Sequence, residues 1–440
     1  MSNNKCKEYV AEIFYAAIRA VDIRALVTFH VDMIGPAFRR SKYNRFLTIG
    51  FGKAVCPMAR ATEESAGDLI EEGIVITKYG HNINQDSGVE SQKSKIKIHE
   101  AGHPVPDENG EAATEEIIDL VKGLNEKSFL LCLISGGGSA LFVSPAEGMT
   151  LDDKKKVTDL LLKSGATIEE LNTIRKHISK VKGGRLAQIA YPSKIISLII
   201  SDVIGDRLDT IASGPTSPDL TTYHDAYKVI QNYGLIELIP GSVLAHIQKG
   251  VQGLVPETPK MGDRVFGQVE NIIMGSNKKA LEAAKTRAES LGLRSEILSS
   301  DISGEARDVG KWLAKKAIEA KGKKQRAMCL ISGGETTVTV KGNGIGGRNM
   351  ELALSFAMEI EGVDGITLLS AGTDGTDGPT DAAGAIVDGQ TVAKAKAWGL
   401  NPEKFLENND SYTFFKETGD LFITGPTGTN VMDIQIVIIE

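Results

Sequence analysis

Short apolar segments alternate with longer amphipathic segments along most of the chain. The near-continuous apolar runs of the first half predict strands at 46–50, 73–77, 95–100, 129–135 and 194–201. Apolar residues spaced by three and four positions predict helices at 5–35, 107–124, 150–164 and 167–188. Strands that are apolar throughout and separated by helices are typical of a buried, largely parallel sheet, which binds ligands at the carboxyl ends of its strands.

A second series of elements follows a stretch with several prolines and a weaker pattern, residues 217–268, which predicts a connector with one or two helices. Further strands are predicted at 270–275, 294–300, 327–332, 336–340, 365–370, 384–388, 421–425 and 433–439. The run 336–340 comes directly after 327–332, which predicts a hairpin and therefore a mixed sheet.

These patterns predict a two-domain α/β protein. We expect a larger, Rossmann-like domain with a parallel sheet at 1–235, a connector at 236–268, and a second α/β domain with a mixed sheet at 269–440. It stays open whether the N-terminal helices pack on the second domain. The hexapeptide Cys-Leu-Ile-Ser-Gly-Gly occurs at 132–137 and again at 329–334. Either each domain presents a similar strand-to-glycine turn, or the two segments have converged on a common strand ending.

Composition excludes several classes of protein. The chain has 440 residues and a net charge of −7, with no basic block, which argues against a nucleic-acid partner. Its N-terminus has the pattern of an amphipathic helix, and there is no uncharged apolar run of about 18 residues, so we expect neither a signal peptide nor a membrane span. The four cysteines lack zinc spacing and predict reduced thiols in a cytoplasmic protein.

Glycines gather where predicted strands end, and two of these turns carry a cation. Lys53 follows the strand 46–50 and Gly52, and Arg348 follows a glycine-rich segment that ends in Gly347. The spacing around Lys53 is not that of the phosphate-binding loop of nucleotide hydrolases. The alternative is that the glycines only make the turn tight and the lysine points into solvent.

The strand 129–135 runs into a triple-glycine segment. Backbone N–H groups without side chains can form a concave anion site, so phosphate-binding residues are predicted at Ser135, Gly136, Gly137, Gly138 and Ser139. The repeated hexapeptide adds Gly333 and Gly334 to this prediction. A flexible turn is the alternative.

Carboxylates follow two other strands. Asp202 and Asp206 follow the strand 194–201, and Asp374 follows the strand 365–370. Such residues suit a Mg²⁺ ligand or a base for a hydroxyl proton, and the alternative is that they cap turns.

The predicted helix 167–188 is basic in a chain that is acidic overall. Spacings of four and three place Arg175, Ser179 and Lys182 on one helix face. This face is either solvated or lies beside an anionic substrate.

Cations at glycine turns, a glycine nest and acidic strand ends are together what phosphoryl transfer requires.

Eight stretches of the sequence carry a resemblance to a known family. They are GFGKA, GHPVPDENG, SGGGSALF, LNTIRKHISKVKGGRLA, SDVIGDRLDTIASGPTSPD, SGGETTVTVKGNGIGGRNMELAL, AGTDGTDGPTDAAGA and TGPTGTNVMD, spread over residues 50–433. In these the chain resembles the class II glycerate kinases, whose C-terminal module is named for its MOFRL motif.

The resemblance implies two α/β domains with the active site in the cleft between them. It implies transfer of the γ-phosphoryl group of ATP to D-glycerate, giving 2-phosphoglycerate, with Lys53 and Arg348 as active-site cations. Asp202 is then a base or, with Asp206 and Asp374, a ligand of Mg²⁺ or another divalent cation. His103, Arg175 and Lys182 are candidates to hold the substrate carboxylate.

Two alternatives from other classes remain at this point. A non-catalytic binder of organic acids would need neither Asp202 nor Asp374. An oxidoreductase is the second alternative, because the family has carried a hydroxypyruvate reductase label, but the segment 50–55 lacks the third glycine of a dinucleotide fingerprint. The expected partners are small molecules, D-glycerate and ATP, and a homodimer is left open.

Overall fold

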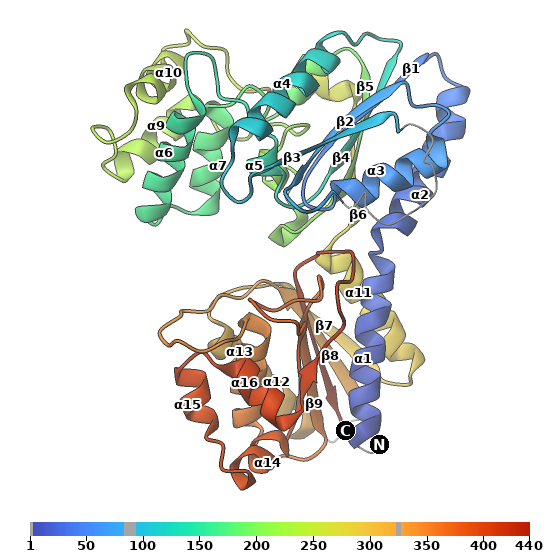
Figure 1. Ribbon diagram of the computed structural model, residues 1–440, viewed down its shortest axis with the longest axis vertical. Coiled ribbons are helices and arrows are strands. Elements are labelled where there is room, and N and C mark those ends of the chain that lie inside the picture. Colours follow the sequence, from blue (N-terminus) through green and yellow to red (C-terminus); the bar gives the residue numbers. More distant parts are fainter. Residues whose placement is uncertain (1–2, 83–93, 323–326) are drawn as a thin grey trace. The chain divides into compact units, whose positions relative to one another are not determined.

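The computed structural model describes residues 3–82, 94–322 and 327–440. The chain forms two α/β units, and Figure 1 labels many of their helices and strands. The first unit is Ile23–Met274, and the second combines Met1–Asp22 with Gly275–Glu440. Helix α1 (Asn3–Ala20) therefore belongs to the second unit, whereas α2 (Ile23–Arg39) belongs to the first.

A six-stranded sheet with the order β3-β2-β1-β4-β5-β6 forms the centre of the first unit. Its strands are β1 (Arg45–Phe51), β2 (Glu72–Lys78), β3 (Ile96–Ala101), β4 (Ser128–Ile134), β5 (Lys194–Ile200) and β6 (Val269–Gly275). The pairings from β3 to β5 are parallel, and all seven residues of β4 are buried. Helices α3 (Val55–Ala66) and α4 (Glu108–Lys122) pack against the sheet, and its central strands β1 and β4 are almost entirely buried.

This parallel arrangement confirms the predicted α/β class and positions the candidate site. Because the strands run in one direction, the carboxyl ends of β1, β4 and β5 lie next to each other at one edge of the sheet. The segments that follow these strands begin with Gly52, Ser135 and Ser201, so the glycine turns and the acidic strand end belong to the same edge.

The prediction that the strand 270–275 opens the second sheet is wrong. In the structure this segment is β6 and lies at the edge of the first sheet. An apolar run of this length specifies a buried strand but not the sheet in which the strand pairs.

A helical cluster extends the first unit. Its members are α6 (Leu151–Lys163), α7 (Ile168–His177), α9 (Tyr223–Asn232) and α10 (Gly241–Val251). They share one hydrophobic cluster that includes Leu161, Ile174, Ile230 and Ile247. Residues 236–268, for which we expected a connector, thus carry α10, whose apolar face packs into this cluster. Thr150, Thr167 and Thr222 form capping boxes that start α6, α7 and α9.

The prediction of one helix over 167–188 is also wrong. Helix α7 ends at His177, and a new short helix, α8 (Arg185–Ala190), begins after Gly183 and Gly184. Both glycines have positive φ, 58° and 81°, which a continuous right-handed helix does not contain. Arg175 and Lys182 therefore do not lie on one helix face.

The second unit has a mixed sheet with the order β11-β10-β9-β12-β8-β7. Its strands are β7 (Arg294–Ile302), β8 (Met328–Gly334), β9 (Ile366–Gly372), β10 (Gly384–Asp388), β11 (Leu421–Phe422) and β12 (Asp433–Ile439). The C-terminal strand β12 pairs antiparallel with both β8 and β9, whereas β7 and β8 are parallel.

The sheet is mixed as predicted, but not through a hairpin at 336–340. That segment forms no strand and makes only one isolated bridge, between Thr337 and Glu305. The position beside β8 is taken by β12, so the run Thr-Thr-Val-Thr-Val has no open edge next to β8 with which to pair.

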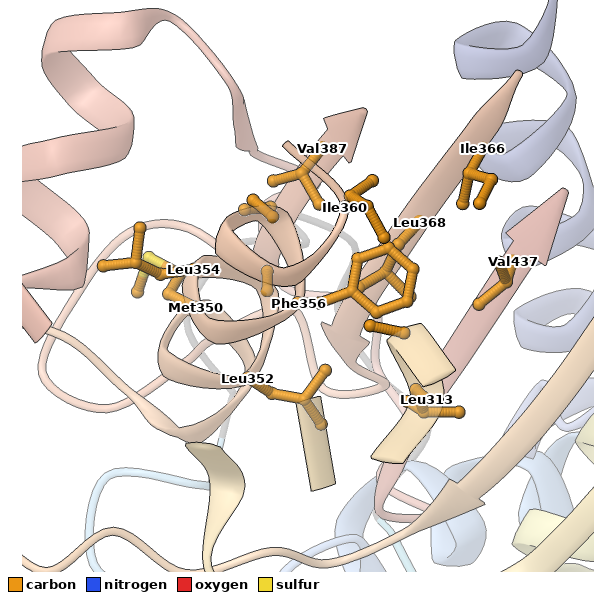
Figure 2. Packing of buried hydrophobic residues seen from close by; sticks show 14 of the residues in the cluster. Leu313, Met350, Leu352, Leu354, Phe356, Ile360, Ile366, Leu368, Val387 and Val437 are labelled. Carbon is orange, nitrogen blue, oxygen red and sulfur yellow. The ribbon is translucent and has the colours of Figure 1, made fainter. Parts of the chain in front are cut away.

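Helices pack against the mixed sheet in two groups. Helix α1 contacts β9, β12 and α11 (Asn277–Ser290), and α12 (Ala306–Gly322) packs with α13 (Arg348–Glu359). Figure 2 shows Phe356 of α13 and Ile360, directly after this helix, beside Leu368 of β9, within the buried cluster of this unit. The short helices α14 (Thr391–Ala397), α15 (Pro402–Glu407) and α16 (Ser411–Thr418) complete it.

Candidate functional site

Lys53 is held at the sheet edge by hydrogen bonds between two neighbouring loops. Its backbone N–H donates to the carbonyl oxygen of Gly136 at 2.8 Å, and the N–H of Ala54 donates to Ser135 Oγ at 3.0 Å. Gly52 has φ of 135°, and a Cβ there would lie 2.2 Å from Ser135 Oγ. The turn before Lys53 thus requires glycine, because the loop after β4 passes directly against it.

The side chains of Lys53 and His103 converge on Gly137. A Cβ on Gly137 would lie 3.1 Å from Lys53 Cε and 3.0 Å from His103 Nε2. Within the described part of the chain, the Lys53 ammonium has no acidic partner. Burial, followed by the positive charges of Lys53 and Lys78, lowers the pKa of His103 to about 4. His103 is therefore neutral at pH 7 and acts there as a hydrogen-bonding group and not as a cation.

The glycine loop after β4 has the features of an anion site. Gly137 has φ of 82°, and Gly138 begins the short helix α5 (Gly138–Leu141). Among the described residues, the N–H groups of Gly136 and Gly137 donate to no protein acceptor. Two adjacent N–H groups without partners, next to a lysine ammonium, are the arrangement that binds a phosphate oxygen.

Asp202 lies against this loop. A Cβ on Gly136 would approach Asp202 Oδ2 to 1.9 Å, so the carboxylate packs directly on the glycine backbone. Asp206 lies four residues further on, in the single turn η1 (Ile204–Asp206), with φ of 53°. Within residues 3–82, 94–322 and 327–440 no three acidic, histidine or cysteine side chains gather into a group that could hold a metal alone.

A pocket of about 570 Å³ begins at Gly137 and His103. Arg175 and Lys182 also line it, although they belong to different elements. Lys182 is fully buried, and its ammonium donates to the carbonyl oxygens of Ser139 at 2.8 Å and Phe142 at 3.2 Å. These bonds fix helix α5. Ser139 Oγ in turn lies 2.8 Å from Ser213 Oγ, so Ser139 is held from two sides.

Arg348 in the second unit is paired with two carboxylates. Its Nε and Nη2 donate to the two oxygens of Asp433 at 2.6 and 3.0 Å, and Nη1 donates to Glu335 Oε1 at 2.6 Å. Asp433 is almost fully buried, and burial raises the pKa of its carboxyl group despite the arginine. The sequence reasoning missed Asp433 and Glu335 as partners of Arg348, although both lie inside the quoted motifs.

Asp377 holds the start of α13, directly beside Arg348. Its carboxylate accepts from the N–H groups of Asn349 at 3.0 Å and Met350 at 2.8 Å. Burial raises its pKa to about 7. A Cβ on Gly347 would lie 2.3 Å from Asp377 Cγ, which explains the glycine before Arg348.

The other predicted site residues of the second unit, Gly333, Gly334 and Asp374, do not form an open loop like the glycine loop after β4. Gly333 and Gly334 stay within β8 and pair with Ile434 and Asp433 of β12. Asp374 accepts from the N–H of Thr376 at 3.1 Å, which is the contact of a residue that caps a turn. The repeated hexapeptide thus ends in an open loop in the first unit and in a paired strand in the second.

Fold and site together define a two-unit α/β protein with a glycine loop and cations suited to a phosphorylated ligand. Two family models match the sequence: a domain of unknown function, DUF4147, over residues 9–248, and the MOFRL family over residues 328–433. No helix of the described residues is both long and apolar enough to cross a membrane.

The sequence and the fold are similar to those of several named proteins. A D-glycerate 2-kinase from Thermotoga maritima is 48% identical over 90% of this chain and 91% of its own length. A crystal structure of a glycerate kinase from the same organism superimposes with a TM-score of 0.89 and 45% identity, covering 99% of this chain and 100% of that one. A relative from Agrobacterium vitis, provisionally named a hydroxypyruvate reductase, is 42% identical over 98% of this chain and 94% of its own length. The chain belongs to the MOFRL family of glycerate kinases.

Proposed function

We propose that this protein transfers the γ-phosphoryl group of ATP to the 2-hydroxyl group of D-glycerate, giving 2-phosphoglycerate. The observation that carries phosphoryl transfer is the packing of the Lys53 side chain, through its Cε, against Gly137 in a loop with unpartnered backbone N–H groups. Family membership supplies the substrate and the choice of the 2-hydroxyl. Such reactions need positioning and charge neutralisation more than covalent chemistry.

The loop Ser135–Ser139 is proposed to bind the phosphates of ATP. Gly136 and Gly137 offer N–H donors, and Lys53 neutralises the charge that spreads over the transferred group. Arg348 is the proposed second cation, held rigidly by Asp433. Lys182 acts on this site by fixing Ser139 and α5. Gly333 allows the close contact between β8 and Asn277, and Gly334 allows the contact between β8 and Ile302 of β7.

The substrate carboxylate is proposed to lie in the pocket beside Arg175, with His103 as a neutral hydrogen-bonding group. The pocket begins at Gly137. With the carboxylate held in this way, the 2-hydroxyl group, which is adjacent to the carboxylate, is the hydroxyl group that lies nearest to the glycine loop.

Asp202 fits a single carboxylate ligand of Mg²⁺. Magnesium in kinases is bound by one or two carboxylates together with phosphate oxygens, and Asp202 is the carboxylate that packs on the phosphate loop. The ion would supply further neutralisation of phosphate charge. Asp374 is a weaker candidate because it accepts from the N–H of Thr376 in its own turn, and Asp206, four residues after Asp202, is the further candidate.

Substituting Asp202 with Asn is expected to lower kcat by about 100-fold or more while the affinity for ATP changes little, because a base or metal ligand acts mainly in the transition state. Steady-state kinetics with both substrates and a thermal unfolding curve measure this. If Asp202→Asn loses thermal stability but keeps kcat, the residue caps a turn and has no role in turnover.

The product identifies the reacting hydroxyl. We expect that the protein incubated with ATP, Mg²⁺, D-glycerate and enolase forms phosphoenolpyruvate at once, because enolase accepts 2-phosphoglycerate directly. Phosphoenolpyruvate that appears only after phosphoglycerate mutase is added would mean that the 3-hydroxyl reacts.

A reductase is the second candidate, favoured only by the provisional name of the Agrobacterium relative. Oxidation of NADH with hydroxypyruvate, measured on the same preparation, separates the two activities. We further infer a cytoplasmic enzyme whose partners are small molecules, with no nucleic acid among them; a homodimer is an additional hypothesis that sedimentation tests.

A further inference from the structure

Three cations, two of them buried and one half-buried, line the pocket that begins at Gly137. They are Lys154 of α6, Arg175 near the end of α7, and Lys182 in the segment between α7 and α8. Lys154 is only 5% exposed and Lys182 is 0% exposed. Lys154, the first of three consecutive lysines, was not among the residues that the sequence suggested.

None of these three cations has an acidic partner among the described residues. Lys154 Nζ lies 3.3 Å from the carbonyl oxygen of Ile178 and 3.5 Å from that of Arg175, both long contacts at the end of α7. The Lys182 ammonium donates hydrogen bonds to the backbone carbonyl groups of Ser139 and Phe142. Burial lowers the pKa of Arg175 and of Lys182.

Three other lysines of this region are paired with acids, which makes the contrast with Lys154 informative. Lys155 contacts Glu108, Lys163 contacts Asp159, and Lys180 contacts Glu115. Acids of this region thus pair with Lys155, Lys163 and Lys180, whereas Lys154, Arg175 and Lys182 have no acidic partner among the described residues. Burying a charge without a counterion is unfavourable, and a bound anion removes this penalty.

The contacts also separate the roles of the three cations. Lys182 is the best satisfied, with two carbonyl acceptors and Ser139 Oγ at 3.3 Å. Lys154 and Arg175 keep donors for a ligand, and the lining of the pocket connects them to His103 and Gly137. A small acid bound here has its carboxylate at Lys154 and Arg175 and its other end toward the phosphate loop.

We propose that Lys154, together with Arg175, binds the carboxylate of the three-carbon acid substrate, and that Lys182 is a positioning residue for the phosphate loop. This inference rests on the proposed function. It adds a specificity-determining residue, because an acid carboxylate is the group that distinguishes glycerate from an uncharged polyol such as glycerol.

The charge of Lys154 depends on pH in the working range. Burial, followed by the charge of Arg175, lowers its pKa to about 7. Other charged groups line the same pocket: His103, Lys155, Asp159, Arg175 and Lys182. Helix α10 also packs on α6, but its His246 and Lys249 line a different pocket. The ammonium is protonated below about pH 7 and loses its charge above it, so the affinity of the free enzyme for D-glycerate falls as pH rises through 7.

The decisive experiment compares Lys154→Met and Lys154→Arg with the wild type. We expect Lys154→Met to raise KM for D-glycerate about tenfold or more at pH 6.5, the usual effect of losing a hydrogen bond to a charged group. The KM for ATP is expected to stay within about twofold, since the phosphates bind elsewhere in the pocket. Lys154→Arg retains the charge and should remove the rise of KM above pH 7.

Lys156→Met is the matched control. Lys156 is exposed on the same helix and is not part of the pocket lining, so its substitution should leave both KM values unchanged. An equal effect of Lys156→Met would mean that only the overall charge of α6 matters and would overturn the proposal. A rise in KM for ATP alone would assign Lys154 to phosphate and overturn the carboxylate assignment.

Two further measurements keep the proposal testable. If Lys154→Met unfolds, the dependence of KM for D-glycerate on pH can still be compared between the wild type and Lys154→Arg. Identical pH profiles of KM would overturn the inference. Calorimetric titration with D-glycerate alone measures binding without turnover. A wild type that fails the enolase assay refutes the proposed function, whereas an active wild type whose Lys154→Met variant binds D-glycerate normally refutes only the role of Lys154.

Discussion

Replacing Lys53 with Met is expected to lower kcat/KM for D-glycerate phosphorylation by about 100-fold or more, the scale found when one preorganised charge is removed from a transition state. The Lys53 side chain reaches Gly137 from a turn that is fixed by backbone hydrogen bonds, and these do not involve its ammonium. The substitution therefore removes charge without removing the contacts that hold the turn. We expect an unchanged thermal unfolding curve.

A second readout of Lys53→Met does not depend on turnover. Burial is the main reason for the low pKa of His103, and the charge of Lys53 is the next contribution. Removing that charge should raise the pKa of His103 from about 4 toward its ordinary value, which an NMR titration of the imidazole can follow. An unchanged pKa would mean that the ammonium points away from His103.

Lys127→Met serves as the control for Lys53→Met. Lys127 is exposed and directly precedes β4, so it lies at the amino end of the same parallel strands and outside the pocket lining. We expect its substitution to leave kcat/KM unchanged. Wild-type kinetics for Lys53→Met would return Lys53 to the role of an ordinary lysine beside a tight turn.

Much of the first candidate site could be predicted from sequence because parallel strands impose their own geometry. Apolar runs locate β1, β4 and β5, and the residues after each strand then meet at one edge of the sheet whatever the loops contain. The relation between Lys53 and the glycine loop followed from this rule. The close approach of Asp202 to Gly136 needed the coordinates, since it depends on the packing of side chains.

Lys154 shows a signal that was present in the sequence but was not used. The buried positions of α6 are Leu151, Lys154, Val157 and Leu161, which follow helical spacing, so the lysine occupies a position on the apolar face. A cation at such a position is either buried or distorts the helix. An analysis of hydrophobic periodicity that treats every lysine as polar cannot detect a lysine that is buried on the apolar face of a helix.

The break of the predicted helix 167–188 has a different cause. Helical spacing continues past His177, and only Gly183 and Gly184 mark the interruption. Glycine lowers helix propensity without forbidding a helix, so the pattern alone favoured continuation. Tertiary contacts decide: Ser179 bridges to Pro145, and Lys182 turns inward to α5.

The partners of Arg348 could not be predicted, because they depend on the order of strands in the mixed sheet. Asp433 begins β12, and its register opposite Gly334 of β8 and Gly372 of β9 places it beside the start of α13. The strand order was not available from the apolar pattern, which predicted a strand at 336–340 instead.

Replacing Arg348 with Ala is expected to reduce both activity and stability, and the two effects can be separated. If Arg348 is the second cation of the reaction, kcat/KM falls by about 100-fold or more. The substitution also leaves the buried Asp433 without its arginine, for which a loss of about 3 kcal/mol in the free energy of unfolding is the expected scale. The Arg348 side chain is 34% exposed, so solvent screening makes the loss in the free energy of unfolding smaller than for a fully buried ion pair.

The loss of stability should depend on pH in a definite direction. Burial already raises the pKa of Asp433, and without Arg348 the neutral acid is favoured further in the folded protein. A carboxyl group whose pKa is higher in the folded than in the unfolded state destabilises the fold increasingly as pH rises above the unfolded value. Urea unfolding at pH 5 and pH 8 should therefore show the larger deficit of Arg348→Ala at pH 8.

The double variant Arg348→Ala/Asp433→Asn decides between a catalytic and a structural role. Asn has nearly the shape of Asp and carries no charge, so the double variant should recover most of the stability lost at pH 8 and show a smaller pH dependence. Its kcat/KM should remain as low as that of Arg348→Ala, because the cation that neutralises the transferred group is still absent. Recovery of activity together with stability would contradict this assignment, since Arg348 would then serve only to compensate Asp433.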